Sequence, residues 1–569
     1  MAGSSAPLMT LKDVFGWVRP IIGPEKNFFW LAIIYGLGIS LLSLATPVSV
    51  QLLINSIANT ALPAPLFTLS ALLFLLLALS GTLAVFRGHM MELFRRRFMA
   101  RLVADITVRA INAANPDFQD TRRIDLFNRY FELITVQKVI PSLLIGGFSI
   151  LLQAGVGFAV TSFYHPFFLA FNIIVIFLVW AIWRVWSRGA MMTSIEISHE
   201  KYNAAHWLES VGASDGFYKT SRHLDYAMAR SDEVAAAYVA AHKRHYGFAL
   251  PQNIALLLLY ALASAGLLAL GGWLVIQQQL SIGQLVAAEL ILAGVFLGIS
   301  QLGSYLDDFY DLVASVEELS LLYAIPQEPE PVTRTLLMSP GGAPLKFSNV
   351  RFQHNTGPVR LDFEIPCGAQ LMAQGAPGLE RQFSNLLKRQ TKPEKGFITI
   401  GDVDIASLDI LLLRTDVVVL DRPNIVESRI DEYLRLANPD REPAAMMAAL
   451  ELVGLEDRLA MLPDGVQTRM SSTGYPLSLA KTMQVKLAAA ILSQPRILVL
   501  SPLFDVVAVS RLQAAFAHFA AAGTTVIYFS NRPEAISLGQ YLWLGRESQQ
   551  IVDDRAVFDA LRNAGRKPE

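Results

Sequence analysis

Three long stretches in the first half of the chain are almost free of charge. Residues 27–86 and 139–183 contain no Lys, Arg, Asp or Glu, and 246–306 contain only Glu289. Each stretch divides once at a short polar segment, at 55–65, 162–166 and 277–281. Each half then approaches or exceeds the ~20 apolar residues that a membrane-crossing helix needs. The pattern predicts six spans, arranged as three hairpins.

Basic residues predict the orientation of these spans. The three short polar segments contain no Lys or Arg, whereas the connections 87–138 and 184–245 are rich in both. Basic connections remain on the cytoplasmic side, so we expect a multi-pass protein of the cytoplasmic (inner) membrane with both termini in the cytoplasm. Segments 191–211 and 230–247 are rich in helix formers and have no internal Pro or Gly. We therefore expect the membrane helices to continue into the cytosol.

The pattern changes after residue 306. An amphipathic helical segment, 305–325, ends a membrane domain that we place at 1–325, and a Pro-rich linker follows at 326–344. From 345 to 569, short apolar runs alternate with helical stretches, which is typical of an α/β domain. The apolar runs lie at 396–401, 416–421, 496–501 and 524–530.

Composition excludes several classes of protein. The 569 residues are 53% hydrophobic and 17% charged, and 47 basic against 48 acidic side chains leave a net charge of −1. That balance argues against a nucleic-acid partner. The single cysteine, Cys367, excludes a disulfide scaffold and a multi-cysteine metal site. The first 27 residues lack the pattern of a cleaved signal peptide.

Four segments of the α/β region follow one another in a recognisable order. They are LKFSNVRFQHNTGPVRLDFEIPCGAQLMAQG, KPEKGFITIGDVDIASLDILLLR, MLPDGVQTRMSSTGYPLSLAK and ILSQPRILVLS. Together with the six spans, they resemble a half-transporter of the ABC exporter superfamily (type I, six-helix) over nearly the whole chain. The resemblance implies an α-helical membrane domain, with six transmembrane helices extending into the cytosol, and a C-terminal α/β ABC-type ATPase-like domain.

The phosphate-binding loop of that family corresponds to GAPGLERQF. Gly375 and Gly378 remain, but Glu380 replaces the last glycine, Arg381 replaces the lysine and Gln382 replaces the hydroxyl residue. A carboxylate there repels a polyphosphate, and a planar guanidinium is no substitute for a lysine in a tight loop. The alternative is that these residues form only a strand-to-helix turn.

The family's other site positions are also altered. Ser501 and Pro502 replace the two acidic residues after a buried strand, and Asn531 replaces the switch histidine. Asp421 stands at the position of the family's glutamine, and His354 at that of the aromatic residue that stacks on adenine. An imidazole can stack on a base, but an ordinary surface histidine is the alternative.

The signature motif reads LSLAK, at 477–481. Ser478 remains, but Leu479 and Ala480 replace two glycines whose backbones must approach the nucleotide. Ser478 either meets an anion or caps its helix. In the family, one subunit's phosphate loop meets the other's signature, so no pairing of this chain gives a complete site. We expect binding of ATP and Mg²⁺ to be disfavoured and hydrolysis to be absent or very slow.

Three residues outside the nucleotide site are further candidates. Glu289, inside the sixth span, either contacts a substrate or a proton or lies close enough to the interface to reach water. Phe127 and Phe217 lie where the family places coupling helices that touch the α/β domain, although ordinary loop packing also explains them.

Several functions remain open at this point. The leading interpretation is half of a dimeric exporter, surrounded by membrane lipid, with a second half-transporter chain that is identical or different and with no nucleic-acid partner. The alternatives are a non-transporting scaffold or regulator of a secretion or assembly complex, and a working exporter ATPase with unusual site residues. The sequence does not indicate a transported substrate.

Overall fold

The computed structural model describes residues 11–59, 64–114, 127–214, 216–328, 341–354, 357–532, 536 and 538–565. The chain forms two compact units, and the boundary after the last membrane helix falls between Gln327 and Glu328. Most of the expected linker lies outside the described residues, so its limits remain a prediction.

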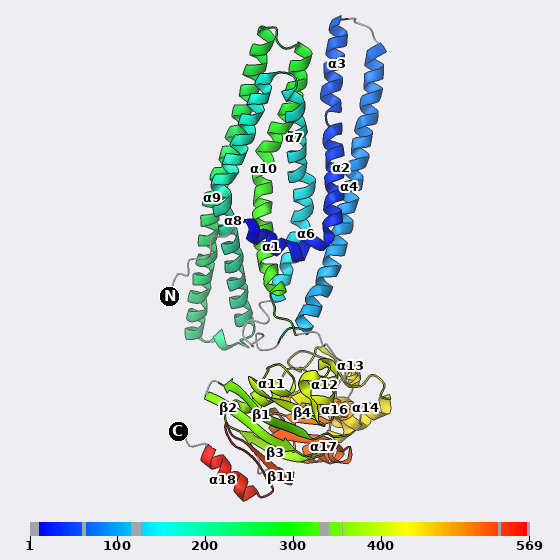
Figure 1. The fold of residues 1–569 in the computed structure, drawn as a ribbon, viewed down its shortest axis with the longest axis vertical. Coiled ribbons are helices and arrows are strands. Elements are labelled where there is room, and N and C mark those ends of the chain that lie inside the picture. The colour runs from blue at the N-terminus through cyan, green and yellow to red at the C-terminus, as the bar shows by residue number, and fades with distance from the viewer. Residues whose placement is uncertain are drawn as a thin grey trace. The chain divides into compact units, whose positions relative to one another are not determined.

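The first unit is a bundle of long helices (Figure 1). Its helices are α1 (Leu11–Ile22), α2 (Lys26–Leu42), α3 (Ala45–Asn59), α4 (Ala64–Ile111), α6 (Glu132–Ser142), α7 (Phe148–Ser162), α8 (Pro166–Gly212), α9 (Ser221–Ile276) and α10 (Ile282–Tyr323). Among the described residues, six helical segments are long and apolar enough to cross a membrane, and they run for 34 to 56 residues. A crossing needs only ~20. The six predicted spans and their helical extensions are therefore confirmed as helices.

Two of the spanning segments are interrupted. The first breaks between α2 and α3, just before Pro47, which has no N–H to bond the carbonyl of Ser43 and whose ring would clash with it. The third contains a π-helical turn, Leu143–Gly147, between α6 and α7. Within this turn Gly146 lies against Tyr305 of α10, and a Cβ at that position would clash with the phenol ring. The glycine therefore allows α10 to approach closely.

The second unit is an α/β domain with two main sheets. Its strands are β1 (Leu345–His354), β2 (Gly357–Ile365), β3 (Gln370–Gly375), β4 (Lys395–Ile400), β5 (Val403–Asp404), β6 (Val417–Leu420), β7 (Ser428–Arg429), β8 (Arg469–Met470), β9 (Ile497–Leu500), β10 (Thr525–Phe529), β11 (Gln540–Leu544) and β12 (Gln549–Val552). One sheet has the order β2-β1-β4-β5 and is antiparallel. The other has the order β12-β11-β3-β10-β9-β6 and is parallel except for β12. All four apolar runs predicted from the sequence are strands.

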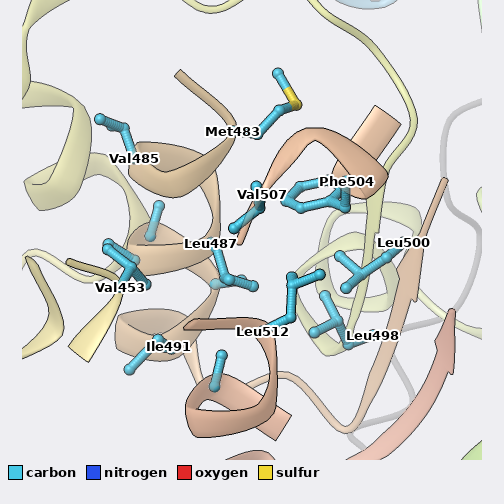
Figure 2. Close-up of a cluster of buried hydrophobic side chains, with 14 of the residues drawn as sticks. Val453, Met483, Val485, Leu487, Ile491, Leu498, Leu500, Phe504, Val507 and Leu512 are labelled. Atoms are coloured by element: carbon cyan, nitrogen blue, oxygen red, sulfur yellow. The ribbon is translucent and has the colours of Figure 1, made fainter. Parts of the chain in front are cut away.

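The helices of this unit pack around the sheets. They are α11 (Leu379–Leu387), α12 (Ile410–Asp416), α13 (Ile430–Ala437), α14 (Pro443–Leu452), α15 (Glu456–Ala460), α16 (Leu479–Ser493), α17 (Val509–Ala521) and α18 (Arg555–Gly565). Figure 2 shows one core, in which Leu487 of α16 and Leu512 of α17 meet Leu498 and Leu500 of β9. Every residue of β9 and β10 is buried. This packing fixes the strands whose ends carry the candidate site.

Candidate functional site

The parallel strands bring the altered motifs together. Because β3, β6, β9 and β10 run in the same direction, their carboxyl ends meet at one edge of the sheet. Two hollows lie there. One is lined by Gly375, Gly378, Glu380, Ser530, Asn531 and Trp543, among others. The other is lined by Glu380, Arg381, Ser384, Asp421, Arg422, Ser501 and Phe529. Glu380 lines both hollows, which therefore adjoin. Seven of the residues singled out from the sequence converge there: Gly375, Gly378, Glu380, Arg381, Asp421, Ser501 and Asn531.

The loop between β3 and α11 has the shape expected of a strand-to-helix turn. Gly378, immediately before α11, has a φ of 81°, a conformation that favours glycine. Phe383 faces inward from α11 and is fully buried. Its ring stacks on Phe347 at 5.2 Å between centroids and meets the edge of Phe529 at 5.7 Å. Aromatic packing thus anchors the helix to both sheets.

Glu380 and Arg381 lie in the first turn of this helix and carry an acidic and a basic group. Glu380 is half-buried, and burial raises the pKa of its carboxyl group above the ordinary value. The neighbouring Arg381 side chain is exposed. Where the resemblance would place a glycine and a lysine, the structure has a half-buried acid and an exposed arginine.

Two lysines that no sequence motif indicated hold the loop after β6. Lys388 Nζ donates to Asp421 Oδ2 at 2.9 Å, and only 16% of each side chain is exposed. Lys486 of α16 donates to the backbone carbonyls of Arg422, at 2.6 Å, and Asn424. Burial lowers the pKa of Lys486 to about 8, although Asp421 opposes the shift. A charged residue in the otherwise apolar segment VKLAAAIL was the available sequence signal for Lys486.

Asp505, a third charged residue that no sequence motif indicated, organises the loop after β10. Its carboxylate accepts hydrogen bonds from the Tyr528 hydroxyl at 2.5 Å, the Ser530 hydroxyl at 2.7 Å and the Asn531 N–H at 2.9 Å. Burial, with a smaller contribution from this carboxylate, raises the pKa of Tyr528. Asp505 therefore positions Asn531 beside the first hollow.

Ser501 directly follows β9 and lines the second hollow. Its backbone N–H donates to the Leu420 carbonyl at 3.1 Å. Its hydroxyl oxygen is buried and has no hydrogen-bond partner among the described residues. Pro502 then opens a short 3-10 helix, Pro502–Val506.

His354 and Ser478 occupy different surroundings. His354 ends β1 beside the phosphate-loop region, because a Cβ built on Gly378 would lie 2.8 Å from its Nε2 atom. Ser478 lines neither hollow. It is the N-cap of α16, and its hydroxyl accepts from the Lys481 N–H at 3.5 Å. Its observed contact is the helix cap.

The three candidates in the membrane unit differ in exposure. Glu289 is half-buried on α10, and its Oε2 atom is buried without a hydrogen-bond partner in the described part of the chain. Phe127 packs against the cluster formed by Phe94 and Leu133 in its own unit. Phe217 is 61% exposed and stacks on His223 at 4.3 Å between ring centroids. Of the two expected coupling residues, only Phe217 presents an exposed ring.

Comparisons with known proteins agree with this architecture. The leukotoxin translocation ATP-binding protein LktB of Mannheimia haemolytica is 23% identical over 97% of this chain and 78% of its own length. A solved bacterial Atm1-family ABC exporter, with ATP bound, superimposes with a TM-score of 0.80 at 19% identity and covers 95% of this chain and 97% of that chain. The chain therefore has the fold of an ABC exporter, and its sequence is similar to that of a bacterial translocation ATP-binding protein. No protein-family model matches it.

Other relatives of the same class match a shorter region. The leukotoxin export protein LtxB of Aggregatibacter actinomycetemcomitans is 28% identical, and the α-hemolysin translocation protein HlyB of Escherichia coli is 30% identical. Each of these matches covers 40% of this chain, which spans only 33% of the relative. The chain is thus similar to bacterial export and translocation ATP-binding proteins, and its described residues include six helical segments able to cross a membrane.

Proposed function

We propose that this chain is one half of a dimeric exporter in which its own nucleotide-binding domain does not hydrolyse ATP. The observation that carries the proposal is the edge where β3, β6, β9 and β10 end. There the groups that ATP chemistry requires are replaced, and Asp421, a remaining carboxylate, is paired with Lys388. The relatives' printed names describe ATP-binding translocation proteins, so the proposed loss concerns this chain and not its class.

The phosphate side of the site supports the proposal. A phosphate loop binds through converging backbone N–H groups and a lysine that reaches the terminal phosphates. In this chain Glu380 places a carboxyl group in the first turn of α11, and the exposed Arg381 side chain stands where the lysine would be. A triphosphate entering here meets repulsion from the ionised form of Glu380 and loses the lysine contact.

The residues at the positions that would hold Mg²⁺ also support the proposal. Mg²⁺ is held by oxygen ligands, usually one or two carboxylates together with the phosphates, and hydrolysis needs a group that orients the attacking water. Ser501 offers only a neutral hydroxyl, and Pro502 offers no polar side-chain atom. Asp421 is already held by Lys388 at 2.9 Å. These residues do not fit Mg²⁺–ATP, and we derive no catalytic step through it.

Pairing with a second chain does not restore the site. A partner's phosphate loop would meet this chain's Ser478–Lys481 segment, in which Leu479 and Ala480 stand where glycines would allow backbone contact. The Leu479 side chain is 43% exposed and would occupy part of that approach. We infer that a dimer containing this chain, with an identical or a different partner, lacks a complete hydrolytic site.

The membrane helices support a location in the inner membrane and a translocation pathway lined by this chain. We infer that the chain lies in the inner membrane with both termini in the cytoplasm, because its long connections are basic and its short ones are not. We also infer that Glu289 contacts the translocation pathway, since a half-buried membrane carboxylate without a described hydrogen-bond partner is expected to face a polar cavity.

An ATPase assay on the full chain in lipid nanodiscs tests the hydrolysis proposal. We expect turnover at background, equal for the wild type, Arg381→Ala and Arg441→Ala, in which an exposed arginine outside both hollows is removed. Turnover that Arg381→Ala abolishes and Arg441→Ala retains would contradict the proposal. A variant combining Glu380→Gly, Arg381→Lys and Gln382→Ser shows whether the loop alone limits nucleotide binding.

A further inference from the structure

A cluster of metal-ligand side chains joins two helices of the membrane unit. His199 projects from α8, and Glu317 and Glu318 project from α10. One ligand atom from each residue lies within 4.8 Å of the other two. His199 Nε2 is 3.3 Å from Glu317 Oε2 and 3.8 Å from Glu318 Oε1. The three side chains therefore converge, although more than a hundred residues separate the two helical segments in sequence.

Glu318 provides the second, independent observation. Its side chain is fully buried, with 0% exposure. Its Oε2 atom accepts a hydrogen bond from Arg129, while its Oε1 atom has no hydrogen-bond partner among the residues that the structure describes. A buried carboxylate oxygen without such a partner is unfavourable. This oxygen is directed toward His199, where a bound cation would satisfy it.

We propose that His199, Glu317 and Glu318 bind a divalent cation of the zinc type. One imidazole nitrogen and two carboxylate oxygens are donors that Zn²⁺ accepts, and three protein ligands leave one coordination position open. Tetrahedral ligands about 2.1 Å from an ion are ~3.4 Å from one another. The separations of 3.3 and 3.8 Å from the imidazole nitrogen are close to that value, and the two carboxylate ligand atoms lie within 4.8 Å of each other, so side-chain rotations would close the site.

The cluster lies beyond the hydrocarbon core of a membrane. His199 is 33 residues after Pro166, the first residue of α8, and Glu317 is 35 residues after Ile282, the first residue of α10. At ~1.5 Å per residue these separations are ~50 and ~52 Å, against a hydrocarbon thickness of ~30 Å. Half of the His199 side chain is exposed. Aqueous ions therefore reach the cluster.

Arg129 would act as a positioning residue for the Glu318 carboxylate. By bonding Oε2 it fixes the Glu318 carboxylate and leaves Oε1 for the ion, as outer partners of metal ligands commonly do. With a neutral imidazole, the two carboxylates and this guanidinium leave the cluster with a net charge of −1, which attracts a cation. A bound ion would fasten α8 to α10 and stabilise the arrangement seen here.

Metal titration of the full chain in detergent, after washing with a chelator, tests the site. Two metal ions serve as probes. Binding of Zn²⁺ is measured by competition with a coloured chelator, and binding of Co²⁺ is measured by its visible absorption. We expect one Zn²⁺ per chain and, for Co²⁺, the strong visible bands of a four-coordinate ion. His199→Ala and Glu317→Gln should each weaken binding by about 100-fold or more, because each removes a ligand. His206→Ala is the matched control on α8 and should leave the affinity unchanged.

Two results would overturn the metal site. One is the absence of stoichiometric binding in the wild type, which would mean that a protonated His199 serves the two carboxylates as an ion-pair partner. The other is binding that His199→Ala and Glu317→Gln leave intact, which would place the ion elsewhere. Size-exclusion profiles identify a variant that fails to fold, and Glu317→Gln keeps the side chain's size. Nucleotide enters none of these measurements, so the result is independent of the proposed function.

Discussion

The strands of the α/β domain have the buried apolar residues that the fold requires, whereas the loops that follow them differ from the exporter pattern in their polar residues. Every residue of β9 and β10 is buried and the strands pair in register, Leu500 beside Tyr528 and beside Leu420. One residue beyond β9, Ser501 stands where the exporter pattern has an acid. Buried apolar area stabilises the fold, whereas polar loop residues at the sheet edge contribute little to it. An ABC-type fold can thus tolerate changes at this sheet edge, as the proposed loss of hydrolysis requires.

The largest expected effect concerns the aromatic anchor of the phosphate-loop helix. Phe383→Ala removes a fully buried ring that contacts Phe347 and Phe529, so it should lower the free energy of unfolding by about 3–5 kcal/mol. Phe397→Ala, on β4, removes a ring that is 50% exposed and should have a much smaller effect. Thermal unfolding of the full chain in detergent measures both. If the two variants were destabilised equally, the expected difference between a buried core ring and an exposed ring would be contradicted.

A smaller, pH-dependent effect should come from Lys486. Its pKa of about 8 is below the ordinary 10.5, so between these pH values the unfolded chain binds more protons and stability rises with pH. The gain is up to about 3 kcal/mol, and Lys486→Met should abolish it. Unfolding midpoints at pH 8 and pH 10 measure the gain, with Lys395→Met, an exposed lysine on β4, as the control. A wild-type rise that survives in Lys486→Met would refute this assignment.

The smallest expected effect is at Ser478. Its hydroxyl accepts one long hydrogen bond at the start of α16, so Ser478→Ala should cost about 0.5–1 kcal/mol and Ser478→Asp should restore the cap. Nucleotide binding should not respond to either change. If Ser478→Ala changes nucleotide affinity while stability stays constant, the residue contacts an anion.

Much of the fold could be predicted from the sequence because its signals are local. The uncharged stretches 27–86, 139–183 and 246–306 predict three hairpins of membrane helices, and each is helical on both sides of its polar segment. Runs such as 496–501 predict buried strands by their apolar composition. The order of the two sheets depends on contacts between distant segments, which no local pattern specifies.

The site was predicted less completely. Motif positions placed Gly375, Gly378, Arg381, Asp421 and Ser501, and the parallel strand order brings these residues to two adjoining hollows. Lys388, Lys486 and Asp505 were missed because they act through contacts across 33, 64 and 26 residues of sequence. Phe127 also shows why local sequence is not enough to assign a role. Its packing inside its own unit depends on helices that its local sequence does not specify.

The most direct test of the central claim is equilibrium binding of a fluorescent ATP analogue to the purified full chain, with and without Mg²⁺. We predict no Mg²⁺-dependent binding up to millimolar nucleotide, and identical titrations for the wild type and Arg381→Ala. Micromolar, Mg²⁺-dependent binding that Arg381→Ala abolishes would contradict the account, because it would show that the altered loop still holds a nucleotide.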